Sequence, residues 1–330
     1  MPDQTVRALS GIHHVTAIAG DPQRNAEFYV GTLGLRLVKR SVNQDDPGTY
    51  HLFYADARGS PGTDLTFFPY PHGLGGVRGN GQAITVAFAI PEEAVDFWTS
   101  RLARAGVDAD RAAGPFGEEA IAFSDPDGLR LALVAGAGTA EREMWSPWLD
   151  GPVPVDVAIR GLHGITLQEA GVDPTAAFLT SVLQFRLVDE ASGLMRFGTG
   201  PGTSGAILDL LPQPGERRGR VAAGTVHHVA WRTPDDHEQR AWRDQIATGG
   251  VEITPVIDRF WFHSIYFREP GGVLFEIATD GPGFTADEAP ERLGERLVLP
   301  PWLEPERPGI EAALPPLRLA RVVGEGRPVR

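Results

Sequence analysis

Apolar and polar residues alternate in a strand-like pattern at two places that resemble each other. GQAITVAFAIP starts at Gly81 and GTVHHVAWRTP at Gly224, and each has proline ten residues after its first glycine. A helical pattern follows both and ends in glycine, as helix C-termini commonly do. A turn and a buried strand then follow, from Asp125 and from Glu269. This repetition predicts two copies of one structural unit.

A second pair of segments repeats in the same way. GIHHVTAIAGD starts at Gly11 and GLHGITLQEAG at Gly161, and each leads to a predicted helix, near 22–31 and 174–183. The chain therefore predicts an α+β fold of four modules of roughly 60 residues each, in the order A, B, A′, B′. Each module reads strand, helix and three further strands (βαβββ).

The repeats divide the chain into two predicted domains and a tail. Modules A and B cover residues 8–137, and modules A′ and B′ cover residues 157–280. The segment Gly136–Asp156 is the predicted linker. Residues 281–330 are rich in proline, and we expect them to pack on the body as a tail with short helices. Trp302 and two Leu-Pro-Pro steps favour this docking over disorder.

The repeat also identifies candidate metal ligands. Combining modules A and B′ brings together His14, His228 and Glu276, whereas the matching positions of A′ and B have no imidazole or carboxylate: Gly164, Thr85 and Ala132. A duplicated scaffold with one functional and one degenerate site explains this difference. Two imidazoles and one carboxylate suit non-haem Fe(II), and Mn(II) stays an alternative because its ligand preferences overlap.

Each candidate ligand histidine has a histidine directly before it. Neighbouring residues of a regular strand point to opposite faces, so only one histidine of each pair can face the metal. The first histidine persists as His163 beside the degenerate Gly164. We therefore assign His14 and His228 as ligands, and His13 and His227 as structural or outer-sphere residues. Hydrogen-bonded core histidines are the alternative, but Glu276 inside an apolar run requires a partner.

Composition narrows the function. The formal net charge of −13 disfavours nucleic acid as a partner, and no apolar run is long enough for a membrane helix. The chain has no cysteine, which excludes disulfides and thiolate chemistry. No secretory signal is visible, so a cytoplasmic protein is the expectation.

Several segments resemble the hydroquinone-type ring-cleaving dioxygenases, a branch of the glyoxalase/bleomycin-resistance/extradiol-dioxygenase (vicinal-oxygen-chelate) superfamily. The resemblance extends from about Leu9 to Leu317 and rests on these motifs: GIHHVTAIAGD, YHLFYAD, SPGTDLTFFPYP, HHVAW, SIYFREPGGVLFE and LPPWLEP. It implies paired βαβββ modules whose curved sheets form two barrels, with A paired to B′. The family's ligands fall on His14, His228 and Glu276.

The resemblance also implies outer-sphere residues, which match His13, Thr16, His227, Arg259 and Tyr266 by position. Tyr266, with His227 or His13, would move protons, and Arg259 would stabilise oxyanion charge. Thr16 would contact substrate. A surface ion pair for Arg259 and a core position for Tyr266 are the alternatives.

The remaining polar candidates carry less information. His263 lies near the site in sequence and is a candidate substrate contact. We expect three histidines to be solvated: His51, His72 and His237. Asp209 lies in an apolar run, and we interpret it as structural.

The expected function is Fe(II)-dependent, extradiol-type cleavage of a hydroquinone or another dihydroxylated aromatic ring, with O2 as co-substrate. One alternative is a glyoxalase-like isomerase or lyase, which needs a further carboxylate from module A. Thr66 or Phe67 stands at that depth unless Asp64 reaches in. A non-catalytic binding protein is the other alternative, and the three intact ligands argue against it. The sequence leaves a homo-oligomer, the ring substituents and the choice between hydroquinone and catechol open.

Overall fold

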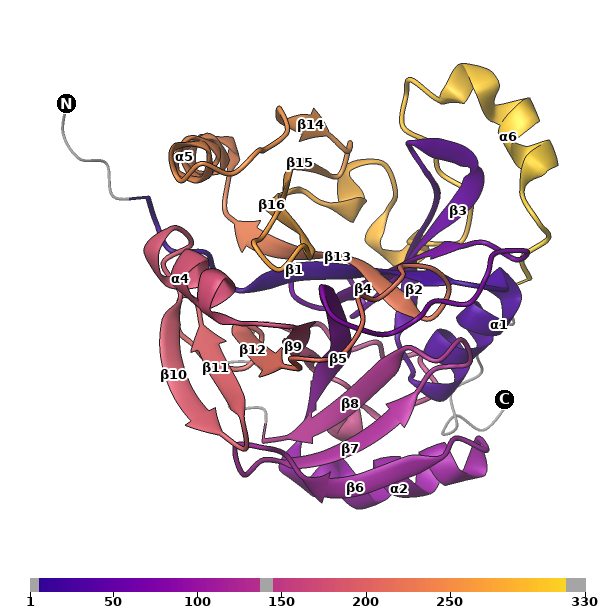
Figure 1. Ribbon diagram of the computed structural model, residues 1–330. Coiled ribbons are helices and arrows are strands. Elements are labelled where there is room, and N and C mark those ends of the chain that lie inside the picture. The colour runs from indigo at the N-terminus through magenta and orange to yellow at the C-terminus, as the bar shows by residue number, and fades with distance from the viewer. Residues whose placement is uncertain (1–5, 137–144, 319–330) are drawn as a thin grey trace.

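The computed structural model describes residues 6–136 and 145–318, and it has an α+β fold built from two curved eight-stranded sheets (Figure 1). Residues 137–144 of the predicted linker and 319–330 of the predicted tail lie outside the described residues.

The four predicted βαβββ modules are present in the predicted order. Module A consists of β1 (Ile12–Ala19), α1 (Pro22–Ala26) continued by a π-helix (Glu27–Thr32), β2 (Arg36–Asn43), β3 (Asp46–Ala55) and β4 (Asp64–Pro69). Module B consists of β5 (Gln82–Ile90), α2 (Val95–Arg104), β6 (Ala109–Ala113), β7 (Glu119–Ser124) and β8 (Arg130–Ala135). Module A′ consists of β9 (Gly161–Glu169), α4 (Asp173–Ser181), β10 (Arg186–Ala191), β11 (Leu194–Gly198) and β12 (Ile207–Pro212). Module B′ consists of β13 (Thr225–Thr233), α5 (Asp236–Thr248), β14 (Ile257–Asp258), β15 (Phe262–Arg268) and β16 (Leu274–Pro282).

The modules pair as the resemblance implies. The first sheet has the order β14-β15-β16-β13-β1-β4-β3-β2 and therefore joins B′ to A. The second sheet has the order β10-β11-β12-β9-β5-β8-β7-β6 and joins A′ to B. In each sheet the two modules meet through one antiparallel pair, β1 with β13 and β9 with β5. Because each sheet takes strands from both halves of the sequence, the division into domains 8–137 and 157–280 stays a prediction.

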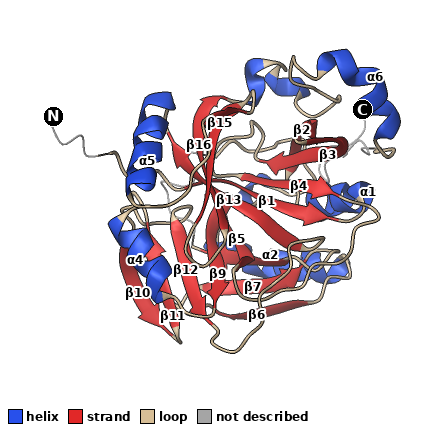
Figure 2. Ribbon diagram, turned by 45° about the horizontal axis from the view of Figure 1, so that its top comes forward, coloured by secondary structure: helices blue, strands red, loops and turns tan. Residues whose placement is uncertain are grey.

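The two sheets share one apolar core. Val15, Trp231, Val86 and Leu167, one from each of the four junction strands, are fully buried in the same cluster. Burying a large apolar side chain stabilises the fold by about 1.5–3 kcal/mol. Alternation along β1 then directs His14 and Thr16 to the face opposite Val15, away from this core. The helices lie at the periphery of the strands (Figure 2).

Helix boundaries follow from local chemistry. Asp235 caps α5 by accepting hydrogen bonds from the backbone amides of His237 and Glu238. Gly106 and Gly250, at φ +71° and +81°, follow the C-terminal ends of α2 and α5. A residue with a side chain is strained in that left-handed conformation, so glycine ends the helix at low cost.

Part of the C-terminal segment after β16 packs on the first sheet. Lys39 of β2 is fully buried, and its Nζ donates to Asp287 Oδ1 at 2.7 Å and to Glu288 Oε2 at 2.5 Å. Tyr50 donates to the carbonyl of Pro315 at 3.0 Å. Trp302, which the sequence suggested as an anchor, is 46% exposed. The apolar anchors are instead smaller or earlier in the tail: Phe284, Leu293, Val298, Leu299, Leu303, Ile310 and Leu314.

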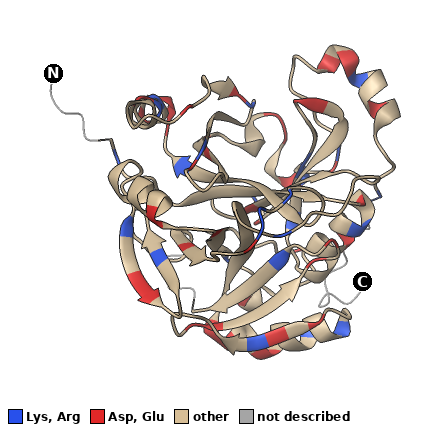
Figure 3. Cartoon of the chain, in the orientation of Figure 1, with Lys and Arg blue, Asp and Glu red and all other residues tan. Residues whose placement is uncertain are grey.

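Charged residues lie mainly at the periphery. Acidic and basic side chains are interspersed on α2, β6 and β10, whereas β1 and β5 at the centres of the sheets carry none (Figure 3). Within residues 6–136 and 145–318, no helix is both long and apolar enough to cross a bilayer.

Candidate metal centre and cavity

Three potential metal ligands converge on neighbouring strands of the first sheet. Nε2 of His14 on β1 lies 3.3 Å from Nε2 of His228 on β13. Oε2 of Glu276 on β16 lies 3.4 Å from His14 Nε2 and 3.0 Å from His228 Nε2. All three residues are buried, and they form the one cluster of three or more potential ligands found among the described residues.

The arrangement fits a metal ion. Glu276 Oε2 is buried and accepts no hydrogen bond from any described residue, whereas Oε1 accepts one from Ser264 Oγ at 2.5 Å. Burial alone would raise the pKa of Glu276, but His14 and His228 hold its pKa well below the ordinary value. Ligand atoms about 2.1 Å from one ion and at right angles to one another lie about 3.0 Å apart. The observed spacing therefore suits three adjacent positions around one ion.

His13 fixes the tautomer of His14. His13 Nε2 lies 3.1 Å from the carbonyl oxygen of Thr279, which can only accept, so this nitrogen carries the proton. Burial, then the charge of His14, lowers the pKa of His13 to about 3, so the ring is neutral and its Nδ1 is an acceptor. His14 Nδ1 lies 2.9 Å away and must be the donor. The lone pair of His14 Nε2 is therefore free for a metal.

His227 stands in the same relation to His228. Their Nδ1 atoms lie 2.8 Å apart, and a metal-binding Nε2 on His228 requires that its Nδ1 donate to His227. The remaining proton of neutral His227 is then on Nε2. Burial, followed by His228, lowers the pKa of His227 to about 3. Unlike His13, His227 lines the cavity described below, so this N–H can face a ligand.

β-Bulges allow two consecutive histidines to act together. In the β1–β13 ladder, Ile12 pairs with Trp231 and His14 with Ala230, which leaves His13 without a partner residue. Likewise, Thr16 pairs with His228 and Ala17 with Val226, which leaves His227 unpaired. A bulge re-aims the extra side chain, so that it need not point away from its neighbour as in a regular strand.

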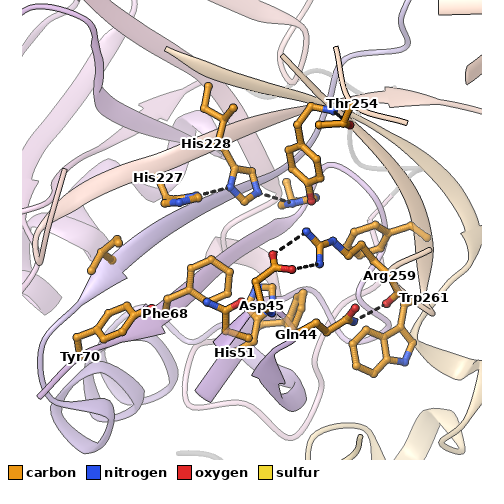
Figure 4. A pocket seen from close by; sticks show the side chains of 17 residues that line it. Gln44, Asp45, His51, Phe68, Tyr70, His227, His228, Thr254, Arg259 and Trp261 are labelled. Atoms are coloured by element: carbon orange, nitrogen blue, oxygen red, sulfur yellow. Dashed lines mark hydrogen bonds and ion pairs between the residues drawn. The ribbon is translucent and has the colours of Figure 1, made fainter. Parts of the chain in front are cut away.

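His14 and His228 line a cavity of about 350 Å³ on the same side of the first sheet (Figure 4). Its walls are mainly aromatic and aliphatic, with a few polar groups, which is typical of small-molecule sites. The residues beyond the two ligand histidines and His227 are Ile18, Asn43, Gln44, Asp45, His51, Phe53, Phe68, Tyr70, Thr254, Arg259, Trp261, Phe262, Tyr266 and Leu274.

Arg259 and Tyr266 lie together in the cavity wall. The guanidinium of Arg259 is 5.5 Å from the centre of the Tyr266 ring and forms a two-pronged ion pair with Asp45, at 2.9 and 3.2 Å (Figure 4). Burial, then the charge of Glu276, raises the pKa of Tyr266, so it is a protonated phenol. Burial alone would lower the pKa of Arg259, but Tyr266 and Asp45 raise it.

The other predicted residues separate into two groups. Thr16 is completely buried and is not among the residues that line the cavity, and its hydroxyl lies 2.8 Å from that of Thr66. His263 is not among the residues that line the cavity, and its Nδ1 pairs with Asp236 of α5 at 2.6 Å. The geometry therefore gives no support to a direct substrate contact from Thr16 or His263. His72 and His237 are exposed, as expected.

His51 is a cavity residue that the sequence reasoning missed. We expected it to be solvated, but it is partly buried in the cavity wall, against Phe53 and Phe68. The available signal was strand alternation, because His51 has the same parity as the aromatic Phe53 along β3.

The second sheet repeats the backbone of this site without its ligands. In the first sheet, Ala230 pairs with both His14 and Glu276, and His228 pairs with Thr16. In the second sheet, Ala87 pairs with both Gly164 and Ala132, and Thr85 pairs with Thr166. The three positions predicted to be degenerate therefore occupy the matching register.

Asp209 belongs to this second sheet and has a structural partner. It accepts two hydrogen bonds from Arg196, both at 2.8 Å, which explains a carboxylate within an apolar run. It takes the place of Thr66 in the repeat, because Asp209 pairs with Thr166 as Thr66 pairs with Thr16.

The chain is similar to known proteins. The model of the Glyoxalase/Bleomycin resistance protein/Dioxygenase superfamily matches residues 11–133 and 161–277. The chain is 45% identical to the "Putative ring-cleaving dioxygenase MhqO" of Bacillus subtilis, over 94% of this chain and 97% of that one. It is 33% identical to the chlorohydroquinone/hydroquinone 1,2-dioxygenase of Sphingobium indicum, over 91% and 94% of the two chains.

A solved structure agrees in fold. The crystal structure of a "putative dioxygenase" from Bacillus subtilis has a TM-score of 0.89 and 44% identity, and the match covers 94% of this chain and 98% of that one. The matched family ranges include all three converging residues, His14, His228 and Glu276. This chain belongs to the glyoxalase/bleomycin resistance protein/dioxygenase superfamily.

Proposed function

We propose that this protein is an Fe(II)-dependent dioxygenase that cleaves the ring of a hydroquinone or a related dihydroxylated aromatic compound. One observation carries the proposal: His14, His228 and Glu276 form a buried group in which Glu276 Oε2 accepts no hydrogen bond, and the two histidines line an aromatic-lined cavity. Both atoms of one O2 molecule enter one ring, and a carbon–carbon bond of that ring is broken. Mn(II) is the alternative ion.

The three side chains would hold the ion by His14 Nε2, His228 Nε2 and Glu276 Oε2. When bound, Fe(II) supplies open positions for a phenolic oxygen and O2, favours loss of the phenolic proton, and carries electrons from ring to oxygen. The protein's part is to present the ligand atoms in their metal-binding state. His13 does so for His14, and His227 does so for His228, through the contacts between their Nδ1 atoms.

The cavity walls orient the ring. Phe68, Trp261 and Phe262 offer aromatic surface to a planar substrate, and a volume of about 350 Å³ suits one substituted ring. Apolar walls also exclude water, which strengthens electrostatic interactions inside the cavity.

Polar groups of the wall handle protons and charge. Tyr266 is a phenol with a raised pKa, so it can donate a hydrogen bond or a proton to oxygen that becomes negatively charged. Neutral His227 can offer its Nε2–H to the same space. Arg259 remains cationic and can stabilise an oxyanion.

Similarity to the chlorohydroquinone/hydroquinone 1,2-dioxygenase supports the substrate class. The isomerase alternative is weaker, because the hydroxyl of Thr66, not a carboxylate, lies beside Thr16. Asp64 does not belong to the converging ligand group. Its pKa is raised by burial and then by Asp56, as expected for an acid away from a cation.

An oxygen electrode tests the proposal. Iron-loaded protein should consume one O2 per ring with hydroquinones or catechols, and mass spectrometry with labelled O2 should find both atoms in a ring-opened product. Conversion of a thiol–aldehyde adduct without O2 uptake would support the isomerase instead. Tight binding of the ring without any turnover would support the non-catalytic alternative.

A further inference from the structure

His51 occupies a defined place in the cavity wall. Its ring packs between two aromatic side chains, with centroids 3.8 Å from Phe53 and 4.4 Å from Phe68, and Figure 4 shows it near Phe68. This packing holds the plane of the imidazole. The ring therefore presents its nitrogens in fixed directions.

One nitrogen of His51 belongs to a buried chain of hydrogen bonds. Its Nε2 lies 2.9 Å from Thr66 Oγ1, and Thr66 Oγ1 lies 2.8 Å from Thr16 Oγ1. Both threonines are completely buried. Nδ1 of His51 has no hydrogen-bond partner within residues 6–136 and 145–318, and the residue lines the cavity.

The number of available protons determines which group donates in each of these two hydrogen bonds. A buried hydroxyl donor needs an acceptor, and each threonine has one proton to donate. If His51 Nε2 donated to Thr66, the contact between Thr66 and Thr16 would use only one of the two hydroxyl protons, and the other would have no acceptor among the described contacts. In the opposite direction Thr16 donates to Thr66 and Thr66 to His51 Nε2, so both hydroxyls are satisfied. His51 then carries its proton on Nδ1, at the cavity.

We infer that His51 donates a hydrogen bond from Nδ1 to the substrate hydroxyl that is not bound to the metal, and so selects dihydroxylated rings over monophenols. This inference rests on the proposed function and deepens it. Burial, and then the charges of His14 and His228, hold the pKa of His51 well below its ordinary value, so the ring has one N–H to offer.

The repeat supports this assignment. Phe53 pairs with Thr66 in the first sheet and Arg196 pairs with Asp209 in the second, so Leu194 stands where His51 stands. The second sheet therefore has neither the histidine nor the Thr66 hydroxyl. The chain of hydrogen bonds is confined to the sheet that has the metal ligands.

Two substitutions test the roles of the two nitrogens of His51 separately. The amide of His51→Asn lies near the position of Nδ1, so it keeps a donor toward the cavity and loses the contact with Thr66. The longer His51→Gln keeps a group near Nε2 and loses the cavity donor. The measurement is the Kd of hydroquinone and of phenol for metal-loaded protein without O2, with binding detected by tryptophan fluorescence or by calorimetry.

The wild type should bind hydroquinone about tenfold more tightly than phenol, because one net hydrogen bond changes an affinity by about that factor. In His51→Gln this ratio should fall to about one while the Kd for phenol stays unchanged, and His51→Asn should keep most of the preference. Thr66→Val should lower the ratio partly and Thr66→Ser should restore it. This second pair tests the chain of hydrogen bonds even if a His51 variant fails to fold.

Failures of the two proposals are distinguishable. Wild-type protein that consumes O2 with hydroquinones but binds phenol equally well overturns the role of His51 alone. A folded His51→Gln variant with an unchanged ratio does the same. Wild-type protein that neither binds these rings nor consumes O2 overturns the proposed function and, with it, the role of His51.

Discussion

The two sheets of this protein have matching strand order and register, but among the described residues only the first presents a group of potential metal ligands. Gly164, Thr85 and Ala132 stand where His14, His228 and Glu276 stand, and even the bulge persists, with His163 in the place of His13. The comparison shows that the duplicated scaffold keeps the backbone positions, while the side chains at three of them differ between a potential ligand group and none.

The sheets also differ in how they are covered. The tail packs against β2 and β3 of the first sheet through Lys39 and Tyr50. Every residue of β10 in the second sheet is exposed or partly exposed. A site that must exclude water is thus combined with a covering segment, and the degenerate copy lacks one at this strand.

The largest expected effect comes from removing one candidate ligand of the first sheet. His14→Ala removes one of three protein ligands and should abolish stoichiometric iron binding and O2 uptake. Thr85→Ala alters the second sheet at the position that matches a ligand and should change neither. Iron analysis of both purified variants checks this, and iron retained by a folded His14→Ala variant would contradict the ligand assignment.

The next effect concerns stability in the second sheet. Asp209→Asn leaves the largely buried guanidinium of Arg196 without its two-pronged partner. Because Arg196 keeps its ion pair with Glu118, the loss should stay below the roughly 3–5 kcal/mol that a buried charge without any partner costs. Denaturant unfolding should show the loss, with iron content unchanged in the folded protein. Equal stability of the variant and the wild type would refute a structural role for Asp209.

A smaller effect is expected for His13. His13→Ala removes the acceptor that fixes the His14 tautomer. Substituting a residue that orients a metal ligand typically lowers metal affinity or activity by about 10–100-fold. Iron should therefore still bind when supplied in excess, but with lower affinity. His163→Ala is the matched control in the second sheet. A complete loss of iron sites in folded His13→Ala, beside full sites in His14→Ala, would reverse the assignment within the pair.

The smallest effect is expected at the cavity mouth. Asp45 pairs with Arg259 but its side chain is 74% exposed, and exposed ion pairs contribute about 0.2–1 kcal/mol. Asp45→Asn should lower stability by less than about 1 kcal/mol, in contrast to Asp209→Asn. A loss comparable to that of Asp209→Asn would show that solvent does not screen this pair.

Much of the fold and the ligand group could be predicted from the sequence because the repeat carries long-range information. His14 and Glu276 are 262 positions apart, and only the comparison of A with A′ and of B with B′ connects them. The bulges at His13 and His227 were not predictable from alternation, since alternation assumes regular pairing.

The positions of two histidines could not be predicted correctly from the sequence pattern. His263 is one position from Ser264, which contacts Glu276, so strand parity places His263 on the opposite face, toward α5. His51 lies between Tyr50 and Leu52 on β3, and its ring packs against Phe53 of the same strand and Phe68 of the adjoining strand β4. Contacts across strands decide such cases, and they require the register of the folded sheet.

Anomalous diffraction at the iron edge from crystals of iron-loaded protein tests the central claim most directly. We predict one iron per chain, with His14 Nε2, His228 Nε2 and a carboxylate oxygen of Glu276 within about 2.0–2.3 Å of it, and no anomalous peak beside Gly164, Thr85 and Ala132. A peak in the second sheet, or no iron between the three residues of the first, would contradict the account.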